Sequence, residues 1–236
     1  MKTIYHKADS RGHANHGWLD TYHTFSFGNY YDPERMHFGM LRVLNDDTVA
    51  PGMGFSKHPH DNMEIISIPI SGDLEHEDSM GNKGIIREGD IQVMSAGKGI
   101  FHSEKNKNRD REVKFLQIWI FPDKHNVEPR YDQISMKDHV NINEFSLVLS
   151  PNPDDQGVWI HQKAYFSMGS FDRSSEDEYN LYEPRNGVYL FVIEGKIKAG
   201  DIELNRRDGL GITEANSIRY TAATGSKVLL MEIPMG

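Results

Sequence analysis

His58-Pro59-His60 and, further along the chain, Gly97-Lys98-Gly99-Ile100-Phe101-His102-Ser103-Glu104 are the two most informative stretches of this sequence. Successive side chains of an extended strand point to opposite faces, so His58 and His60 share one face, as do His102 and Glu104. Two such pairs on facing strands can close around one metal ion. Three imidazoles and a carboxylate suit iron(II), and zinc, copper, nickel, cobalt or manganese would also fit, whereas an oxygen-rich calcium site is disfavoured.

The spacing around both stretches indicates strands joined by tight turns. Gly52 precedes the histidine pair, Glu64 follows it, and Gly72 ends the apolar run 65–70. This order of glycine, His-x-His, glutamate and glycine resembles the first motif of the cupin superfamily, and Gly97 to His102 resembles the second. The match has two departures, because one extra residue separates Glu64 from Gly72 and Gly97 stands where the second motif has proline.

A narrower resemblance accounts for those departures. The chain is similar to the pirin family, and in particular to bacterial pirin-like proteins with quercetinase activity. The segments that carry this similarity are Arg11–Leu19, Thr24–Phe27, Tyr30–Pro33, His58–His60 and Met94–Glu104. The resemblance implies an all-β bicupin of two double-sheet jelly-roll barrels with few short helices. It also implies a single metal ion, most typically iron(II), held by His58, His60, His102 and Glu104.

The fourth ligand is left open by the residues themselves. Strand alternation permits both Glu64 and Glu104, because positions 58, 60, 62 and 64 would share one face of a continuous strand. The resemblance favours Glu104, and Glu64 then orients a ligand or lines the mouth of the site. We expect Glu104 to act also as the catalytic base, with Glu64 as the alternative.

The length of the chain allows one large β domain or two smaller ones, and two small barrels are the natural division. The 236 residues suffice for two barrels that each bury a core, and we expect an N-terminal metal-binding cupin domain over 1–130 and a C-terminal cupin domain over 131–236. The second half has only His125, His139 and His161 and no His-x-His, so no second metal site is expected there.

Short apolar runs separated by glycine, asparagine and aspartate predict strands throughout. The clearest runs are 40–44, 115–121, 188–193 and 228–233, and we expect short helices only at 32–36 and near 174–177. The polar segment 122–144 is predicted to cross between the halves.

Composition excludes several classes of protein. The chain has no cysteine, so disulfide and thiol chemistry are ruled out. A formal net charge of −9 argues against sequence-independent nucleic-acid binding. The N-terminus lacks the apolar core of a signal peptide, and no apolar stretch approaches membrane-spanning length. We therefore expect a cytoplasmic protein that binds neither nucleic acid nor membrane, and the resemblance implies a monomer.

The resemblance implies a quercetin 2,3-dioxygenase reaction, in which a metal-bound flavonol reacts with dioxygen, its central ring opens and carbon monoxide is released. The partners would then be dioxygen and a small planar phenolic substrate. Phe27, Gln117 and Trp119 are the expected substrate-binding residues, because an aromatic substrate needs apolar walls with few polar groups. Phe55, whose parity is opposite to that of the ligands, is expected in the core or at the rim. His13, His16 and His23 are expected to be scaffold histidines.

Two other functions predict the same ligands. One is a non-enzymatic, redox-sensitive iron-binding pirin that acts as a regulatory binding partner. The other is a metal-binding relic with an unknown substrate, for which flavonol turnover is incidental. The sequence does not separate these functions from the enzyme through the site alone.

Overall fold

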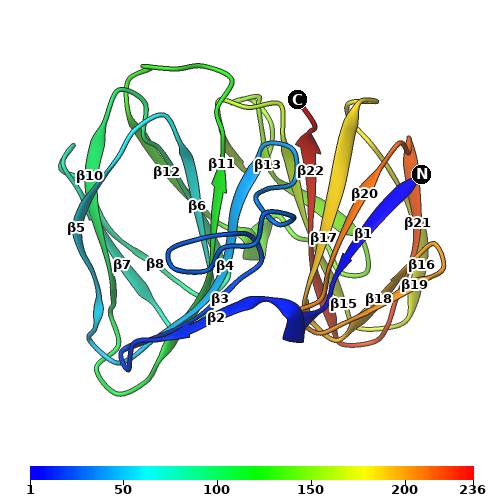
Figure 1. The fold of residues 1–236 in the computed structure, drawn as a ribbon, viewed down its shortest axis with the longest axis horizontal. Helices are drawn as coiled ribbons and strands as arrows, with labels where there is room; N and C mark the ends of the chain where they lie inside the picture. Colours follow the sequence, from blue (N-terminus) through cyan, green and yellow to red (C-terminus); the bar gives the residue numbers. More distant parts are fainter.

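The computed structural model describes residues 1–236 and consists almost entirely of β-strands, with two short 3-10 helices. Four sheets are stacked across the molecule, two in each half (Figure 1). The two seven-stranded inner sheets face each other at the centre, and a four-stranded outer sheet closes each half. The predicted all-β bicupin is therefore confirmed.

The first half has its inner sheet in the order β12-β9-β6-β11-β4-β3-β2 and its outer sheet in the order β5-β10-β7-β8. The strands of the inner sheet are β2 (Gly12–Asn15), β3 (Leu19–His23), β4 (Leu41–Val49), β6 (Glu64–Ser71), β9 (Asp90–Ser95), β11 (Val113–Ile120) and β12 (Arg130–Ser135). Those of the outer sheet are β5 (Gly54–His60), β7 (Leu74–Asp78), β8 (Lys83–Ile86) and β10 (Ile100–Asn106).

The second half repeats this plan, with an inner sheet in the order β1-β20-β17-β22-β15-β13-β14 and an outer sheet in the order β16-β21-β18-β19. The inner strands are β1 (Lys2–His6), β13 (Phe145–Ser150), β14 (Val158–Trp159), β15 (Tyr165–Phe171), β17 (Asn186–Glu194), β20 (Gly209–Thr213) and β22 (Ser226–Pro234). The outer strands are β16 (Ser175–Asn180), β18 (Lys196–Ala199), β19 (Ile202–Asn205) and β21 (Ser217–Ala222).

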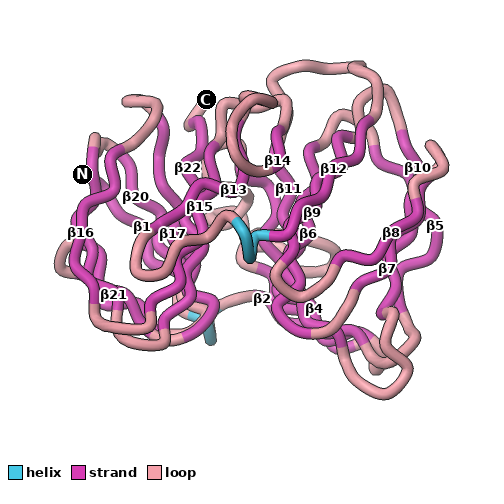
Figure 2. The backbone as a smooth tube through the Cα atoms, turned by 180° about the vertical axis from the view of Figure 1, so that it is seen from behind, coloured by secondary structure: helices cyan, strands magenta, loops and turns pink.

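The N-terminal strand joins the distant half of the molecule. β1 pairs with β20 in the second half, and the 3-10 helix η1 (Ala8–Ser10) then leads to β2 in the first half (Figure 1). Near the middle of the chain, β12 pairs with β9 and is followed by the second 3-10 helix, η2 (Met136–Asp138), which lies between the halves (Figure 2).

The two inner sheets share one apolar core. On β11 the side chains of Leu116, Ile118 and Ile120 are fully buried and belong to the same cluster as Phe166 and Met231 of the second half. Because side chains alternate along a strand, residues 115, 117 and 119 face the interior of the first half instead. The inner sheet of the first half therefore joins the other half with one face and leaves its opposite face for the site.

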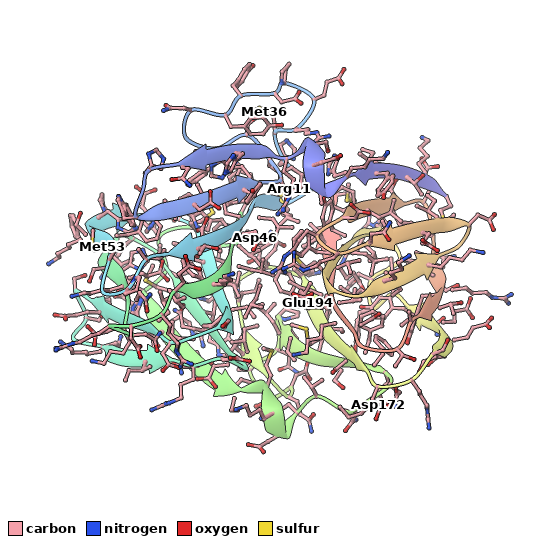
Figure 3. All side chains as sticks on the ribbon, turned by 90° about the horizontal axis from the view of Figure 1, so that it is seen from below. Arg11, Met36, Asp46, Met53, Asp172 and Glu194 are labelled. Carbon is pink, nitrogen blue, oxygen red and sulfur yellow. The ribbon has the colours of Figure 1, made fainter.

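Charged residues also join the halves. Asp46 Oδ2 lies 3.2 Å from Nη1 of Arg11 and 3.1 Å from Nε of Arg207, and all three side chains are largely buried. Arg11 and Asp46 lie near the middle of the molecule, between the halves (Figure 3). Arg207 comes from the loop between β19 and β20 of the second half, so this triad is an electrostatic contact across the interface.

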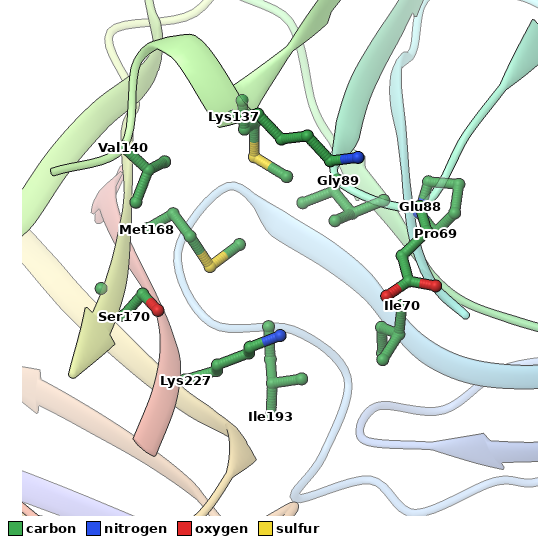
Figure 4. A pocket seen from close by; sticks show the side chains of 13 residues that line it. Pro69, Ile70, Glu88, Gly89, Lys137, Val140, Met168, Ser170, Ile193 and Lys227 are labelled. Atoms are coloured by element: carbon green, nitrogen blue, oxygen red, sulfur yellow. The ribbon is translucent and has the colours of Figure 1, made fainter. Parts of the chain in front are cut away.

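A cavity of about 230 Å³ lies where the halves meet. Ile70 lines it from the first half, Met168 and Lys227 line it from the second, and Lys137 of η2 completes the wall (Figure 4). No histidine lines this cavity, and Glu88 is its only carboxylate. It therefore lacks the ligand set that the sequence predicts for a metal centre.

Two local predictions are wrong. Residues 32–36 form turns and 175–180 form strand β16, so neither expected helix is present, and the two short helices lie elsewhere. The segment 122–144 does connect the halves, but it contains β12, because Arg130 to Ser135 extend the first inner sheet beside β9.

No helix of the structure has the length and apolar character needed to span a membrane.

Candidate metal centre

Three histidines converge on the inner face of the first outer sheet. His58 and His60 lie near the end of β5, and His102 lies on the adjacent antiparallel strand β10, directly opposite His58. The ring of His102 is centred 4.4 Å from that of His58 and 4.9 Å from that of His60. One ring nitrogen of each histidine lies within 4.8 Å of the others, which brings all three predicted histidine ligands together.

A β-bulge gives this cluster its aromatic neighbour. Phe55 pairs with Glu104 and His58 pairs with His102, so β5 has one residue more than β10 between the two pairs. The extra residue reverses the alternation, and Phe55 then faces the same way as His58 and His60. The expectation that Phe55 has the opposite parity was wrong, because it assumed an unbroken strand; Phe55 lines the cavity beside the histidines.

The histidines have the properties of metal ligands. Burial is the main cause that lowers the pKa of His60 to about 4 and that of His102 to about 2, so both rings are neutral at physiological pH. His102 is only 2% exposed, yet neither of its ring nitrogens has a hydrogen-bond partner. Buried polar atoms are nearly always paired. The unpartnered nitrogens of His102 and the donor set of neutral imidazoles therefore fit a borderline divalent ion.

Glu104 is held from the facing sheet. Its Oε1 accepts a 2.8 Å hydrogen bond from Ser67 Oγ, and its Oε2 accepts a 2.6 Å bond from Gln117 Nε2. Burial raises the pKa of Glu104 to about 7, although the hydrogen bonds from Ser67 and Gln117 act to lower it. A carboxylate oxygen of Glu104 lies within 4.8 Å of nitrogens of His76 and His102, so the structure places Glu104 beside one of the three predicted histidine ligands.

The partners of Glu104 belong to a polar row that crosses the first inner sheet. Cross-strand pairing aligns six residues on one face, from β3 to β12: His23, Asn45, Gln117, Ser67, Gln92 and Gln133. Paired residues in a sheet project to the same side. The row therefore lies opposite the histidine cluster.

His76 is a residue that sequence reasoning missed. It pairs with Glu104 on β10, is 1% exposed, and its Nδ1 has no hydrogen-bond partner, while its Nε2 lies 3.3 Å from Asp78 Oδ2. The alternation of His76 and Asp78 within a short strand was a signal that could have identified both as inward-facing. His76 stands on the inner side of the centre, next to two of the predicted ligands.

The cavity beside the histidines has a volume of about 260 Å³. All three predicted substrate-binding residues, Phe27, Gln117 and Trp119, line it. Phe27 and Trp119 meet edge to face with their centroids 5.4 Å apart, and Trp119 Nε1 is buried without a hydrogen-bond partner. Asn45 and Asp47 of β4 also line the cavity, and sequence reasoning did not identify either of them.

Glu64 lies apart from this cavity. The expectation that it shares a strand face with the histidines was wrong, because β5 ends at His60 and Glu64 begins β6 in the other sheet. Its Oε2 accepts a 2.6 Å hydrogen bond from Ser95, and burial raises its pKa to about 7 in spite of the nearby charge of Arg130. Glu64 thus makes its polar contacts near residues 122–144, the segment that connects the halves.

Comparison with known proteins agrees with this geometry. A family profile described as Pirin matches residues 5–120, and one described as quercetinase C-terminal cupin domain matches residues 147–233. The chain is 40% identical over 228 residues to a quercetin 2,3-dioxygenase of Escherichia coli, with 97% of each chain covered. It is 37% identical to a pirin-like protein of Caulobacter vibrioides, with 95% of this chain and 96% of the relative covered.

A solved structure is similar over almost the whole chain. The bacterial pirin YhhW of Escherichia coli in complex with nickel(II) is 39% identical, covers 99% of both chains and superposes with a TM-score of 0.93. Two double-sheet halves, one of which carries the histidine cluster, define a bicupin with a single metal centre. Within that class, the matching profiles and relatives show that the chain belongs to the pirin family.

Proposed function

We propose that this chain is a metal-dependent dioxygenase that opens the central ring of flavonols such as quercetin. The observation that carries the proposal is the cavity in which three histidines face Phe27, Trp119 and a carboxylate. Metal ligands, apolar aromatic walls and a proton acceptor are the parts that oxidation of a planar phenol requires. The name of the Escherichia coli relative supports the same reaction.

His58, His60 and His102 would hold the ion, with Glu104 as the fourth ligand. A bound divalent cation would lower the pKa of a flavonol hydroxyl that coordinates it. Glu104 is suited to receive that proton, because its carboxylate lies beside His102 and accepts hydrogen bonds only from neutral partners. Ser67 and Gln117 fix the direction of its carboxylate throughout.

The walls orient the substrate. Phe27 and Trp119 present apolar ring surfaces, and planar ligands gain from edge-to-face and offset contacts with such rings. Trp119 Nε1 offers a buried hydrogen-bond donor that has no partner within the protein. We assign it the role of binding a substrate oxygen, because an unpaired buried donor is costly until a ligand satisfies it.

We further propose iron(II) as the working ion and the first half as the whole catalytic unit. The nickel complex of the Escherichia coli relative supports a single divalent ion in this fold. Imidazole and carboxylate ligands accept most first-row metals, so supply decides which ion fills the site. The second half, which has no comparable cluster of histidines, would serve as a structural partner.

The test is anaerobic reconstitution with iron(II), followed by quercetin and oxygen, while the flavonol absorbance and the release of carbon monoxide are recorded. We expect stoichiometric carbon monoxide, no turnover by His58→Ala, and full turnover by His161→Ala, which removes a histidine of the second half. Tight iron binding without loss of quercetin would overturn the proposal and favour a non-enzymatic metal protein.

A further inference from the structure

A second cavity adjoins the cavity beside the histidines, which we call the metal-side cavity. We call it the vestibule; it has a volume of about 460 Å³, and the residues that line it alone include His13, His16, Thr21, His23, Asn29 and Tyr30. Four residues line both spaces: Phe27, Asn45, Asp47 and Phe55. The vestibule thus begins where the metal-side cavity ends, and it contains the three histidines that were expected to be mere scaffold.

Size indicates that the two cavities serve one ligand. Pockets for ligands of ordinary drug size span roughly 300 to 1,000 Å³. The metal-side cavity, at about 260 Å³, is smaller than that range and must also admit the ion, whereas the vestibule adds about 460 Å³. A three-ring substrate whose reacting oxygen reaches the histidines must therefore place another of its rings in the vestibule.

The floor of the vestibule offers hydrogen-bond acceptors. An amide oxygen only accepts, so the 2.9 Å contact between His23 and Asn45 Oδ1 means that Nδ1 of His23 carries the proton. Burial lowers the pKa of His23, which keeps the ring neutral and leaves Nε2 as an acceptor. Thr21 Oγ1 donates to Oδ1 of Asp47, and the other oxygen of that carboxyl is left for a ligand.

Aromatic groups and a glycine shape the walls. The ring of Phe27 lies 5.3 Å from that of His23 and 5.4 Å from that of Trp119, so it stands between the two cavities. Tyr30 packs directly on Gly12, where a Cβ would come within 2.3 Å of the tyrosine ring. The absence of a side chain at residue 12 thus lets Tyr30 close one side of the vestibule over its polar floor.

We infer that the vestibule binds a hydroxylated aromatic ring of the substrate, with His23 and Asp47 accepting hydrogen bonds from its hydroxyl groups. The inference rests on the proposed flavonol chemistry. It means that the hydroxyl groups on this ring determine how tightly different flavonols bind. A flavonol then spans both cavities, with its metal-binding oxygen at the histidine cluster and its hydroxylated phenyl ring on the vestibule floor.

The test is anaerobic binding to the nickel-loaded protein, followed by quenching of tryptophan fluorescence. Quercetin carries two hydroxyls on its phenyl ring and galangin carries none, while their metal-binding oxygens are the same. We expect quercetin to bind on the order of tenfold more tightly than galangin, as two net hydrogen bonds would give. His23→Phe and Asp47→Leu should each lower this ratio.

His37→Phe is the matched control, because His37 is an exposed loop residue that lines neither cavity. One nickel ion per chain verifies that each variant is folded, and Asp47→Leu carries the comparison if His23→Phe fails that check. Equal binding of the two flavonols by the unmodified protein, or an unchanged ratio in the variants, would overturn the vestibule assignment alone. Failure of the nickel protein to bind either flavonol would overturn the proposed function as well.

Discussion

Gln117 and Glu104 lie on facing sheets, and Nε2 of Gln117 donates a 2.6 Å hydrogen bond to Oε2 of Glu104. Ser67, the cross-strand neighbour of Gln117, holds the other oxygen of the same carboxylate. Both partners are neutral, so they orient Glu104 without making it a weaker base through a nearby positive charge. The inner sheet thereby sets the direction of a residue that the outer sheet carries.

This contact predicts that Gln117→Leu weakens metal binding. Residues that orient a metal ligand typically change affinity by about 10- to 100-fold when they are removed. We expect a loss of that size in the nickel affinity measured by calorimetry. Gln92→Leu is the control, because Gln92 belongs to the same polar row but makes no contact with Glu104. Equal losses in the two variants would mean that general disturbance of the sheet, and not the Gln117 contact, sets the affinity.

The histidine cluster predicts the metal content of variants. His102→Ala should reduce bound metal from one ion per chain to none, because His102 belongs to both groups of potential ligands. His125→Ala, which alters an exposed histidine outside these groups, should retain one ion. Metal analysis after dialysis measures both. An ion retained by His102→Ala would place the centre elsewhere.

Glu64 and Glu104 should respond differently to the same change. Glu64→Gln should leave metal affinity and flavonol turnover within about twofold, because Glu64 contacts Ser95 outside the cavity. Glu104→Gln should lower turnover strongly, since general-base contributions are typically about 10²- to 10⁴-fold. Steady-state rates of the two iron-loaded variants make the comparison. A larger loss for Glu64→Gln would return the role of base to that residue.

Burial of Asp47 predicts a pH-dependent stability of the metal-free protein. Its pKa is raised from 3.8 to about 7, chiefly by burial, so the folded state retains the proton over a range where the unfolded chain has lost it. Stability relative to Asp47→Asn should therefore fall as pH rises from about 4 to 7, by at most about 1.4 kcal/mol per pH unit. Urea unfolding with a chelator at pH 5 and pH 8 measures this, and a constant difference would contradict it.

Neutralising Asp46, which pairs with both Arg11 and Arg207, should cause a large loss of stability. Asp46→Asn leaves Arg11 and Arg207 close together without their shared anion, and breaking a buried ion pair typically costs about 3–5 kcal/mol. Glu77→Gln breaks an exposed pair with Lys83 and should cost less than about 1 kcal/mol. Thermal and urea unfolding distinguish the two. Similar small effects would show that the triad contributes little to the contact between halves.

Local alternation, together with the motif spacing around both stretches, was sufficient to predict the histidine cluster. His58, His60 and His102 were identifiable because period-two spacing within short strands fixes which side chains share a face. The strand-rich fold was likewise visible in apolar runs separated by turn residues. Phe27 and Trp119 were expected because an aromatic substrate needs apolar walls, and both line the cavity although Phe27 lies outside the named strands.

Features that depend on pairing between distant segments were not predictable. The bulge that turns Phe55 toward the histidines is set by how β5 registers with β10, and no residue within β5 marks it. The hydrogen bonds from Ser67 and Gln117 to Glu104 join two different sheets, so no sequence spacing indicates them. The position of Glu64 was mistaken for the same reason, because a chain reversal between His60 and Glu64 sends the two residues to separate sheets.

The path of β1 means that no single cut yields two intact pieces. A fragment that ended at residue 130 would contain β1 without its partner β20 and would lack most of β12. The complementary fragment would expose β20 as an unprotected edge, and such edges recruit other chains and aggregate. Split-protein fusions and isolated halves should therefore be poorly soluble, and the whole chain is the smallest unit suitable for expression.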